Sequence, residues 1–451
     1  MNIIIVGCGQ VGQTLAEQLI DAGNNVTVID TVYEKVKSLT DRVDALGIVG
    51  NGASHTTLAE ADVAGADLLI AVTDSDELNL LCCTVAKKTS DCKVIARVRN
   101  HEYNAEANFL KNELGLAMVI NPEYEAAEEI ARVLRFPSAI SIETFGKGRV
   151  ELIKFRLPED SPIVGMSVKE VINKFKCDAL FATVERGDKA YIAKGDFAFE
   201  PKDVISVITP SAGATDFFQN IGFKTQAVRS AMIVGCGEIT HYLCSMFKKS
   251  KLNIKVIEKD YALCEEMSEA FPHITVVHGN TSNQEIMAEE GLARVGAFLA
   301  LSDSDEENIL LSLYAKSKTK GKVVTKMKRV DYGDVMDKLD LDTVIYPKNI
   351  VSDMIIRYVR SLKNTRGSNM ETLYNVIKGE VEASEFIIRK TSAIVGTPLS
   401  KLKFKRNVLV AAILREGHVI IPRGYDTIEI GDAVVVVSKV TGLHDITDIL
   451  E

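Results

Sequence analysis

The chain opens with an apolar, β-branched run that stops at a series of glycines. The run, residues 2–6, favours a strand, and Gly7-Cys8-Gly9-Gln10-Val11-Gly12 follows it directly. Beyond these glycines, apolar residues recur with the spacing of one helix face until Gly23, at Val11, Leu15, Leu19 and Ala22. The pattern predicts a strand, a tight glycine-rich turn and a helix.

This turn is suited to a phosphate group. The amides of the turn and of the helix N-terminus would point at one spot, and Gly7 and Gly9 carry no side chain that keeps an anion away. A second apolar run, 26–29, ends in Asp30, where dinucleotide-binding folds place the carboxylate that binds the ribose. We therefore predict a nucleotide site formed by Gly7, Cys8, Gly9, Gln10, Val11, Gly12 and Asp30. The alternative for Asp30 is a cap on the following helix.

Strands and helices then alternate along the chain. Apolar runs and amphipathic stretches predict strands at 45–49, 67–73, 93–98 and 118–120 and helices at 77–88, 102–114 and 122–134. Such alternation is typical of an α/β fold with a parallel sheet wound on both faces, whose ligands bind at the carboxyl ends of the strands. That edge adds Asn51, Thr73, Asp74 and Arg97 to the predicted site. The alternatives are a helix cap for Thr73 and Asp74 and an ion pair with a neighbouring acid for Arg97.

A small β-rich module follows, and then the whole arrangement repeats. The module is predicted from strand patterns within 138–157 and at 179–184, 190–193 and 204–209. The second glycine motif begins at Gly235, 228 residues after Gly7, and Glu258 lies 228 residues after Asp30. The repeat predicts four domains, two Rossmann-like at 1–136 and 229–362 and two small and β-rich at 137–221 and 369–451. It also predicts a second nucleotide site at Gly235, Cys236, Gly237, Glu238, Ile239, Glu258, Asn280, Ser302 and Asp303.

The two copies differ inside the glycine motif. Thr240 stands where the first copy has Gly12, so a branched side chain has to find room between helix and strand. Glu238 replaces the neutral Gln10, and its carboxylate competes with a phosphate for the helix N-terminus. We expect the first site to bind a dinucleotide more tightly than the second.

The composition narrows the class of protein. The 451 residues are too many for one core, and the formal net charge of −9 argues against nucleic acid as a partner. No apolar run reaches the length of a membrane span, and the N-terminus lacks the pattern of a secretory signal. The eight cysteines include no C-x-x-C pair, so we expect buried free thiols and no metal site.

The sequence gives no clear sign of catalytic residues. Tyr33 and Lys37 have the spacing of a proton-transfer pair of short-chain dehydrogenases, but they follow Asp30 at the adenosine end of the site. In the second copy Tyr261 is followed by Glu265 in place of the lysine. We therefore favour a nucleotide-binding protein that is not an enzyme. The alternative is an NAD-dependent oxidoreductase whose active site forms between chains.

These motifs and the doubled architecture resemble the TrkA family of tandem RCK (regulator of potassium conductance) proteins. The resemblance covers essentially the whole chain. It implies a cytoplasmic regulatory subunit, peripheral on the inner face of the plasma membrane, that forms a ring, expected to be a tetramer. That ring would lie beneath a Trk-type potassium channel-like membrane subunit and gate ion flow. Because Asp30 and Glu258 favour a free ribose 2′-hydroxyl, we expect NAD(H) as the ligand, with ATP or ADP as alternatives that share its adenosine and diphosphate.

Two helices carry apolar stripes that suit assembly. In 349–362 the stripe comprises Ile350, Met354, Ile355, Tyr358 and Leu362, and 123–134 is the equivalent helix of the first copy. We expect these stripes to be assembly faces. The alternative is that each covers its own sheet.

Overall fold

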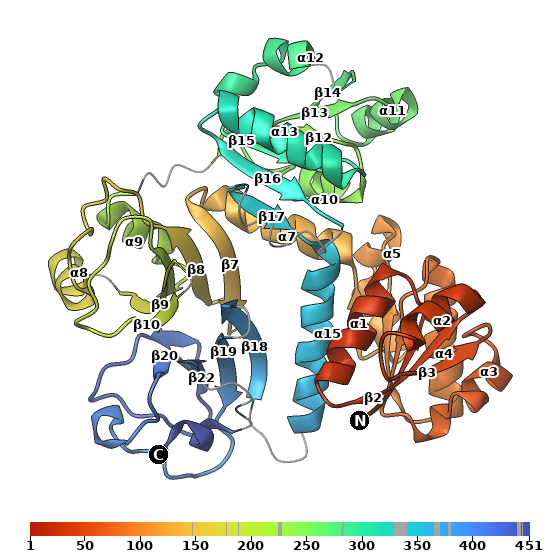
Figure 1. Ribbon diagram of the computed structural model, residues 1–451, viewed down its shortest axis with the longest axis horizontal. Coiled ribbons are helices and arrows are strands. Elements are labelled where there is room, and N and C mark those ends of the chain that lie inside the picture. The colour runs from red at the N-terminus through yellow and green to blue at the C-terminus, as the bar shows by residue number, and fades with distance from the viewer. Residues whose placement is uncertain are drawn as a thin grey trace.

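Four β-sheets form the framework of the described part of the chain (Figure 1). Two of them are parallel and six-stranded, and two are antiparallel and five-stranded. The computed structural model describes residues 1–451 except 147, 177, 188, 224–227, 281–283, 329–338, 340, 365–369, 378–379, 440–442 and 444. None of the helices in this described part is both long enough and apolar enough to cross a membrane. The expected fold class, two Rossmann-like α/β units each followed by a small β-rich unit, is confirmed.

The first parallel sheet has the strand order β3-β2-β1-β4-β5-β6 of a dinucleotide-binding fold. Its strands are β1 (Asn2–Val6), β2 (Asn25–Asp30), β3 (Leu46–Val49), β4 (Leu68–Ala71), β5 (Lys93–Arg97) and β6 (Met118–Ile120). Its helices are α1 (Gln10–Asp21), α2 (Tyr33–Thr40), α3 (His55–Glu60), α4 (Asp76–Thr89), α5 (His101–Ala105) and α6 (Ala107–Glu113). The single helix expected at 102–114 is therefore two short helices, which meet at Glu106.

The first β-rich unit is an antiparallel sheet of order β10-β9-β11-β8-β7. Its elements are β7 (Ala139–Phe145), β8 (Val150–Arg156), α8 (Val168–Phe175), β9 (Leu180–Arg186), β10 (Lys189–Ile192), β11 (Val204–Pro210) and α9 (Ala214–Asn220). A cluster of aromatic side chains fills its core, with Phe155, Phe181, Phe199, Phe217 and Phe218 all buried.

The second half of the chain repeats both sheets. The parallel sheet has the order β14-β13-β12-β15-β16-β17 and the β-rich sheet the order β18-β19-β22-β20-β21. The parallel unit comprises β12 (Ser230–Val234), α10 (Glu238–Met246), β13 (Asn253–Glu258), α11 (Tyr261–Ala270), β14 (Thr275–His278), α12 (Gln284–Glu289), β15 (Ala297–Ala300), α13 (Asp305–Lys318), β16 (Lys322–Lys326) and β17 (Thr343–Ile345). The β-rich unit comprises β18 (Met370–Ile377), β19 (Val381–Ile387), β20 (Val408–Arg415), β21 (His418–Ile420) and β22 (Ala433–Ser438).

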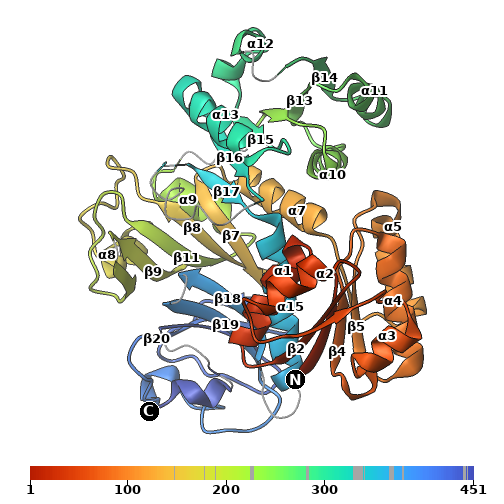
Figure 2. The same cartoon turned by 45° about the vertical axis from the view of Figure 1, so that its right-hand side comes forward.

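The helix that leaves each parallel sheet packs on the other half of the chain. Helix α7 (Pro122–Arg135) buries Ala126, Ala127 and Ile130 in the core of the second unit, and it contacts α10. Helix α15 (Pro347–Asn364) buries Val351, Ile355 and Val359 in the core of the first unit and runs beside α1 (Figure 2). Of the stripe predicted at 349–362, Ile355 and Tyr358 pack on the first unit, whereas Ile350 packs on the second. The two helices therefore join the two halves of one chain.

The two β-rich units also share a core. Phe145, Leu152 and Ile208 of the first unit cluster with residues of the second that include Ala412 and Val437. Hydrogen bonds also cross the contact, among them one from the Tyr374 hydroxyl to the Thr144 carbonyl at 2.9 Å and one from the Gly146 amide to the Glu385 carboxylate at 3.0 Å. The halves are thus locked together at the helices and again at the β-rich sheets.

Candidate nucleotide-binding sites

The three glycines of the first motif have three different roles. Gly7 adopts a φ of +105°, and a Cβ there would lie 3.0 Å from the backbone nitrogen of Thr73. At Gly12 a Cβ would lie 1.9 Å from the Gly7 carbonyl oxygen, because α1 packs directly on the loop. A Cβ at Gly9 would meet nothing within 4 Å, so this position faces open space. Gly7 and Gly12 are required by the fold, and Gly9 leaves room for a ligand.

The carboxylate of Asp30 forms a hydrogen bond with the backbone of the glycine loop. One oxygen accepts a hydrogen bond from the Cys8 amide at 2.7 Å, and the other accepts one from the Val32 amide at 3.0 Å. A carboxylate offers about four lone-pair positions, so acceptor capacity is left for ribose hydroxyls. A cavity of about 180 Å³ lies here and is lined by residues that include Gly7, Gly9, Asp30, Asn51, Thr73 and Asp74.

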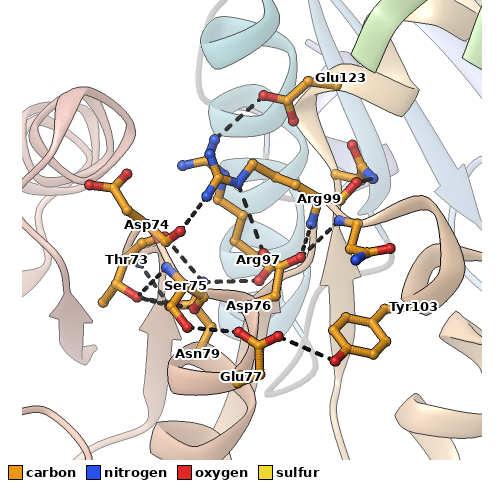
Figure 3. A network of polar contacts seen from close by, with 12 residues as sticks. Thr73, Asp74, Ser75, Asp76, Glu77, Asn79, Arg97, Arg99, Tyr103 and Glu123 are labelled. Atoms are coloured by element: carbon orange, nitrogen blue, oxygen red, sulfur yellow. Dashed lines mark hydrogen bonds and ion pairs between the residues drawn. The ribbon is translucent and has the colours of Figure 1, made fainter. Parts of the chain in front are cut away.

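The loop from Thr73 to Asp76 is fixed by a buried amide. The Asn79 Oδ1 atom accepts from the Thr73 amide at 2.8 Å and from the Thr73 hydroxyl at 2.7 Å. The Asn79 Nδ2 atom donates to the carbonyl of Arg97 at 3.0 Å, which joins the ends of β4 and β5 (Figure 3). Because its hydroxyl proton is already used, Thr73 can accept a hydrogen bond from a ligand more readily than it can donate one.

Arg97 does not line the first cavity. Its guanidinium lies 3.5 Å from the carboxylate of Glu123, which is the ion pair considered as the alternative (Figure 3). Burial lowers the pKa of Arg97, and the Glu123 charge opposes that shift. Arg97, Gln10 and Val11 instead line a cleft of about 560 Å³ between the two parallel units, with residues of the second unit that include Gly237, Glu238, Ile239, Lys326 and Lys328.

The second unit builds an equivalent site around Glu258. This carboxylate accepts hydrogen bonds from the amides of Cys236 at 2.9 Å, Lys259 at 2.8 Å and Asp260 at 2.9 Å. The adjoining cavity measures about 440 Å³ and is lined by residues that include Gly235, Cys236, Gly237, Glu258, Ser302 and Asp303. Asn280 follows β14 and stands next to 281–283, which lie outside the described residues.

The two substitutions inside the second motif are accommodated differently. Thr240 is fully buried, and its hydroxyl donates to the Gly235 carbonyl at 2.7 Å. Glu238 and Ile239 line the cleft between the units and are not among the residues that line the second cavity in the described part. Burial raises the pKa of Glu238, and the nearby His101 of the first unit opposes the shift. Glu238 therefore lines the cleft together with charged residues of the first unit, Arg99 and His101 among them.

The cysteines of both motifs are protonated thiols. Burial raises the pKa of Cys8 to about 12, and the Asp30 carboxylate adds to the shift. In the second motif burial raises the pKa of Cys236 to about 12, and Glu258 adds to it. The seven cysteines in the described part of the chain are all free thiols. A thiol with such a pKa is a poor nucleophile and a poor metal ligand at neutral pH.

Several residues around the sites were not predicted from the sequence. Lys35 lines the first cavity, and Arg99 and Lys328 line the cleft between the units. Arg99 and Lys328 lie 229 residues apart, so the internal repeat contained the signal for a basic side chain at this place. Tyr242, whose hydroxyl contacts the first unit, has threonine at its equivalent, Thr14, and the repeat gave no signal for it.

Comparison with known proteins adds a family to this geometry. Residues 3–122 and 231–347 match the TrkA-N domain, and residues 152–222 and 383–451 match the TrkA-C domain. The TrkA-N matches end where α7 and α15 begin, so the two exchanged helices lie outside them.

Relatives match this chain over almost their full length. "Trk system potassium uptake protein TrkA homolog 1" of Methanosarcina mazei is 30% identical over 99% of this chain and 99% of its own length. "Trk system potassium uptake protein TrkA" of Haemophilus influenzae is 28% identical over 97% of this chain and 95% of its own length. A solved structure of the "GsuK channel bound to NAD" has a similar fold, with a TM-score of 0.63 and 14% identity over 97% of this chain and 76% of that one. With both domain types present twice in alternation, the chain belongs to the TrkA family.

Proposed function

We propose that this chain is a nucleotide-sensing regulatory subunit that binds NAD(H) and gates a Trk-type potassium channel-like membrane subunit. The observation that carries the proposal is the position of the glycine loops. Each loop lies at the N-terminus of a helix, α1 or α10, that packs against the helix exchanged from the other half, α15 or α7. The exchanged helices continue toward the β-rich units. A ligand at either loop therefore acts on helices that both halves share.

The ligand assignment rests on the acids at the ends of β2 and β13. Asp30 and Glu258 suit the 2′-hydroxyl of a ribose, and their negative charge would repel the 2′-phosphate of NADP. NAD(H) is supported further by the glycine spacing and by the NAD bound to the GsuK channel, a protein of similar fold. ATP and ADP share the adenosine and diphosphate, so they are the competing ligands in the test below. The proposed contacts are the residues of the two motifs and of the loops that begin at Asn51, Thr73, Asn280 and Ser302.

The proposed partner is suggested by the relatives. They are named as potassium uptake proteins, and they match this chain over nearly their full length. We propose that four copies of the chain form a ring on the cytoplasmic face of the plasma membrane, held there by the membrane subunit. A ligand would change gating only to the extent that it binds two shapes of this ring with different affinity. Light scattering at micromolar concentration tests the assembly, and a monomer would contradict it.

Reconstitution with the membrane subunit tests the function. The two proteins are placed in liposomes, and potassium flux is measured with NAD, NADH, ATP or ADP added on the side that carries the chain. We expect flux to depend on NAD or NADH when the chain is present and not when it is omitted. The Asp30→Ala variant is the matched control, because it removes the ribose acceptor of the first site. A flux that no nucleotide changes would contradict the proposal.

The alternative function is an NAD-dependent oxidoreductase with an active site between chains. The observation that would favour it is the basic and acidic lining of the cleft, which includes Arg97, Glu123 and Lys326. An absorbance assay at the nicotinamide band with alcohol, aldehyde and amino-acid substrates separates the two functions. Turnover by the assembled protein would support the enzyme, whereas nucleotide binding without turnover supports the sensor.

A further inference from the structure

A tyrosine side chain of the second unit forms hydrogen bonds with the first unit. The Tyr242 hydroxyl donates to the carbonyl of Arg99 at 2.8 Å and accepts from the Asn121 Nδ2 atom at 2.8 Å. The Asn121 amide also donates to the Arg99 carbonyl, at 3.1 Å. Tyr242 and Asn121 are only 6% and 3% exposed, so water does not compete for these bonds.

The Arg99 segment is tied in turn to the 73–76 loop of the first site. The amides of Arg99 and Asn100 both donate to the Asp76 carboxylate at 2.8 Å, and the Arg99 guanidinium donates to the Asp74 carbonyl. Figure 3 shows the Asp76 carboxylate pointing toward Arg99, in the same network of polar contacts as Thr73. Thr73 and Asp74 line the first cavity. A displacement of the Arg99 carbonyl would therefore also displace residues of the 73–76 loop, which lines the first site.

The other end of this connection is the second glycine loop. Tyr242 lies on α10, which begins at Glu238 directly after Gly237. When the first turn of a helix shifts, the next turn moves with it, because backbone hydrogen bonds between residues i and i−4 join successive turns. Gly237 lines the second cavity. Tyr242 is therefore about one helical turn away from a ligand bound in that cavity.

The first unit makes no equivalent contact through the residue that corresponds to Tyr242. The residue equivalent to Tyr242 in the first unit is Thr14, 228 positions earlier. Its hydroxyl donates to the Gln10 carbonyl at 3.0 Å, within its own helix α1. The second loop is therefore linked to the wall of the first site, through the Arg99 segment, by a side chain that has no counterpart at Thr14.

We infer that Tyr242 is a positioning residue that transmits occupancy of the second cavity to the 73–76 loop of the first. This inference rests on the proposed function, since it requires a nucleotide in the second cavity. Coupling between two ligand sites typically changes affinity by about 5- to 150-fold, which one buried hydrogen-bonded link can affect measurably.

Amide hydrogen exchange with NAD as the probe tests the inference. In the Gly9→Ala variant a methyl group occupies the open position of the first loop, so NAD is expected to load only the second site. We expect NAD to slow exchange at 235–240, to leave 7–12 unchanged, and to change exchange at 73–79 by about fivefold. Adding Tyr242→Phe should abolish the change at 73–79 and keep the protection at 235–240.

Matched controls separate coupling from loss of structure. Tyr124→Phe also removes a hydroxyl at this seam, but that hydroxyl contacts Glu128 on its own helix at 3.1 Å, so the change at 73–79 should persist. Asp76→Ala cuts the next link and should abolish the change as Tyr242→Phe does, which keeps the test valid if Tyr242→Phe does not fold. A change at 73–79 that survives both Tyr242→Phe and Asp76→Ala, or protection at 235–240 with no change at 73–79 when Tyr242 is present, overturns the inference. No protection by NAD at either loop of the parent protein overturns the proposed function, and the inference with it.

Discussion

The hydroxyl of Thr240 donates a hydrogen bond of 2.7 Å to the carbonyl of Gly235, at the base of the second glycine loop. In the first unit Gly12 takes this place, and a Cβ there would lie 1.9 Å from the equivalent carbonyl oxygen of Gly7. The first helix therefore touches its loop directly, whereas the second helix is joined to its loop by a side chain. The same fold achieves the contact between helix and loop in two ways.

We expect substitutions at these two positions to have opposite tolerance. Gly12→Thr should destabilise the first unit strongly, because the new side chain meets backbone atoms that cannot move aside. Thr240→Val should cost about 1–3 kcal/mol of unfolding free energy, since it leaves the buried Gly235 carbonyl without its donor. Thr240→Ser is the control, and it should cost less. Chemical denaturation of each variant measures the difference, and equal stability of Thr240→Val and the parent would contradict the role of the hydroxyl.

The Asp30→Ala variant should weaken NAD(H) binding to the first site. The carboxylate accepts hydrogen bonds from the loop at Cys8 and from Val32, and in our proposal also from the ribose. We expect a loss of about 1–3 kcal/mol in binding free energy, measured by calorimetry. Glu258→Ala is the matched variant of the second site. It keeps the ribose acceptor of the first site, so it should change first-site affinity only through the coupling between the two sites. Parent-like affinity in Asp30→Ala would show that the ribose assignment is wrong.

The two nucleotide sites should differ in affinity, with the first tighter. A Cβ at Gly9 or at Gly237 meets nothing within 4 Å, so an alanine at either position obstructs the ligand without disturbing the fold. We expect Gly9→Ala to remove the tight phase of an NAD titration and Gly237→Ala to spare it. Loss of the tight phase in Gly237→Ala alone would reverse the order of the sites.

The crossing of α7 and α15 should make stability depend on pH. A cavity of about 610 Å³ there is lined by residues that include Glu129, Glu143, Asp353, Arg132 and Arg357. Burial, with the Glu143 and Asp353 charges, raises the pKa of Glu129 from 4.5 to about 8, and Arg132 and Arg357 oppose the shift. Between about pH 4.5 and pH 8 the folded chain therefore holds a proton that the unfolded chain has released. The unfolding free energy falls as the pH rises through this range.

The Glu129→Gln variant tests this dependence, because the amide mimics the protonated carboxyl without titrating. We expect its melting temperature to match that of the parent at about pH 5 and to exceed it at about pH 9. Glu128→Gln, one position along the same helix, is the control for loss of a carboxylate, because the Glu128 side chain is 40% exposed. A parent and a Glu129→Gln variant that respond alike to pH would contradict the prediction.

The exchanged helices predict how the chain behaves when it is divided. If residues 1–223 and 228–451 are produced as separate chains, each carries an apolar stripe whose cover lies on the other, at Ala126 and Ile130 on α7 and at Val351 and Ile355 on α15. We expect each half alone to aggregate and the two together to form a soluble one-to-one complex. Size-exclusion chromatography with light scattering measures this, and two stable, separate monomers would contradict it.

Much of the fold could be predicted from the sequence because its signals are local. The strand, glycine turn and helix at residues 2–21 and the acid at Asp30 follow from hydrophobic spacing and from the conformation that Gly7 adopts. The helical break at Glu106 was missed, since the apolar positions of 102–114 continue across it. The exchange of α7 and α15 was also missed, because a stripe shows that a helix face is buried without showing which sheet buries it.

The candidate sites were predictable where the repeat doubled the signal. Thr73 and Asn79 recur as Ser302 and Asn308 with matching hydrogen bonds, of 2.8 Å and 2.9 Å from the backbone amide to the asparagine. The partner of Arg97 was open in the sequence, because its ion pair with Glu123 depends on how α7 leaves the sheet. Tyr242 could not be found from the repeat, since it contacts a backbone carbonyl of the other half and no pattern of residue types encodes such a contact.

The exchange of α7 and α15 bears on how such a chain could arise and diverge. Two copies of a single unit, each lending its last helix to the other, would make a symmetric pair of separate chains. Joining them end to end keeps every contact and adds one restriction, that each first unit meets a second unit and never another first unit. In a pair of identical chains, every substitution is present on both sides of the contact between them. In the joined chain, a substitution in one copy is present on one side only. Thr240 and Tyr242, whose equivalents in the first copy are Gly12 and Thr14, are differences of this kind. One chain can therefore hold two sites of the same fold that are not interchangeable.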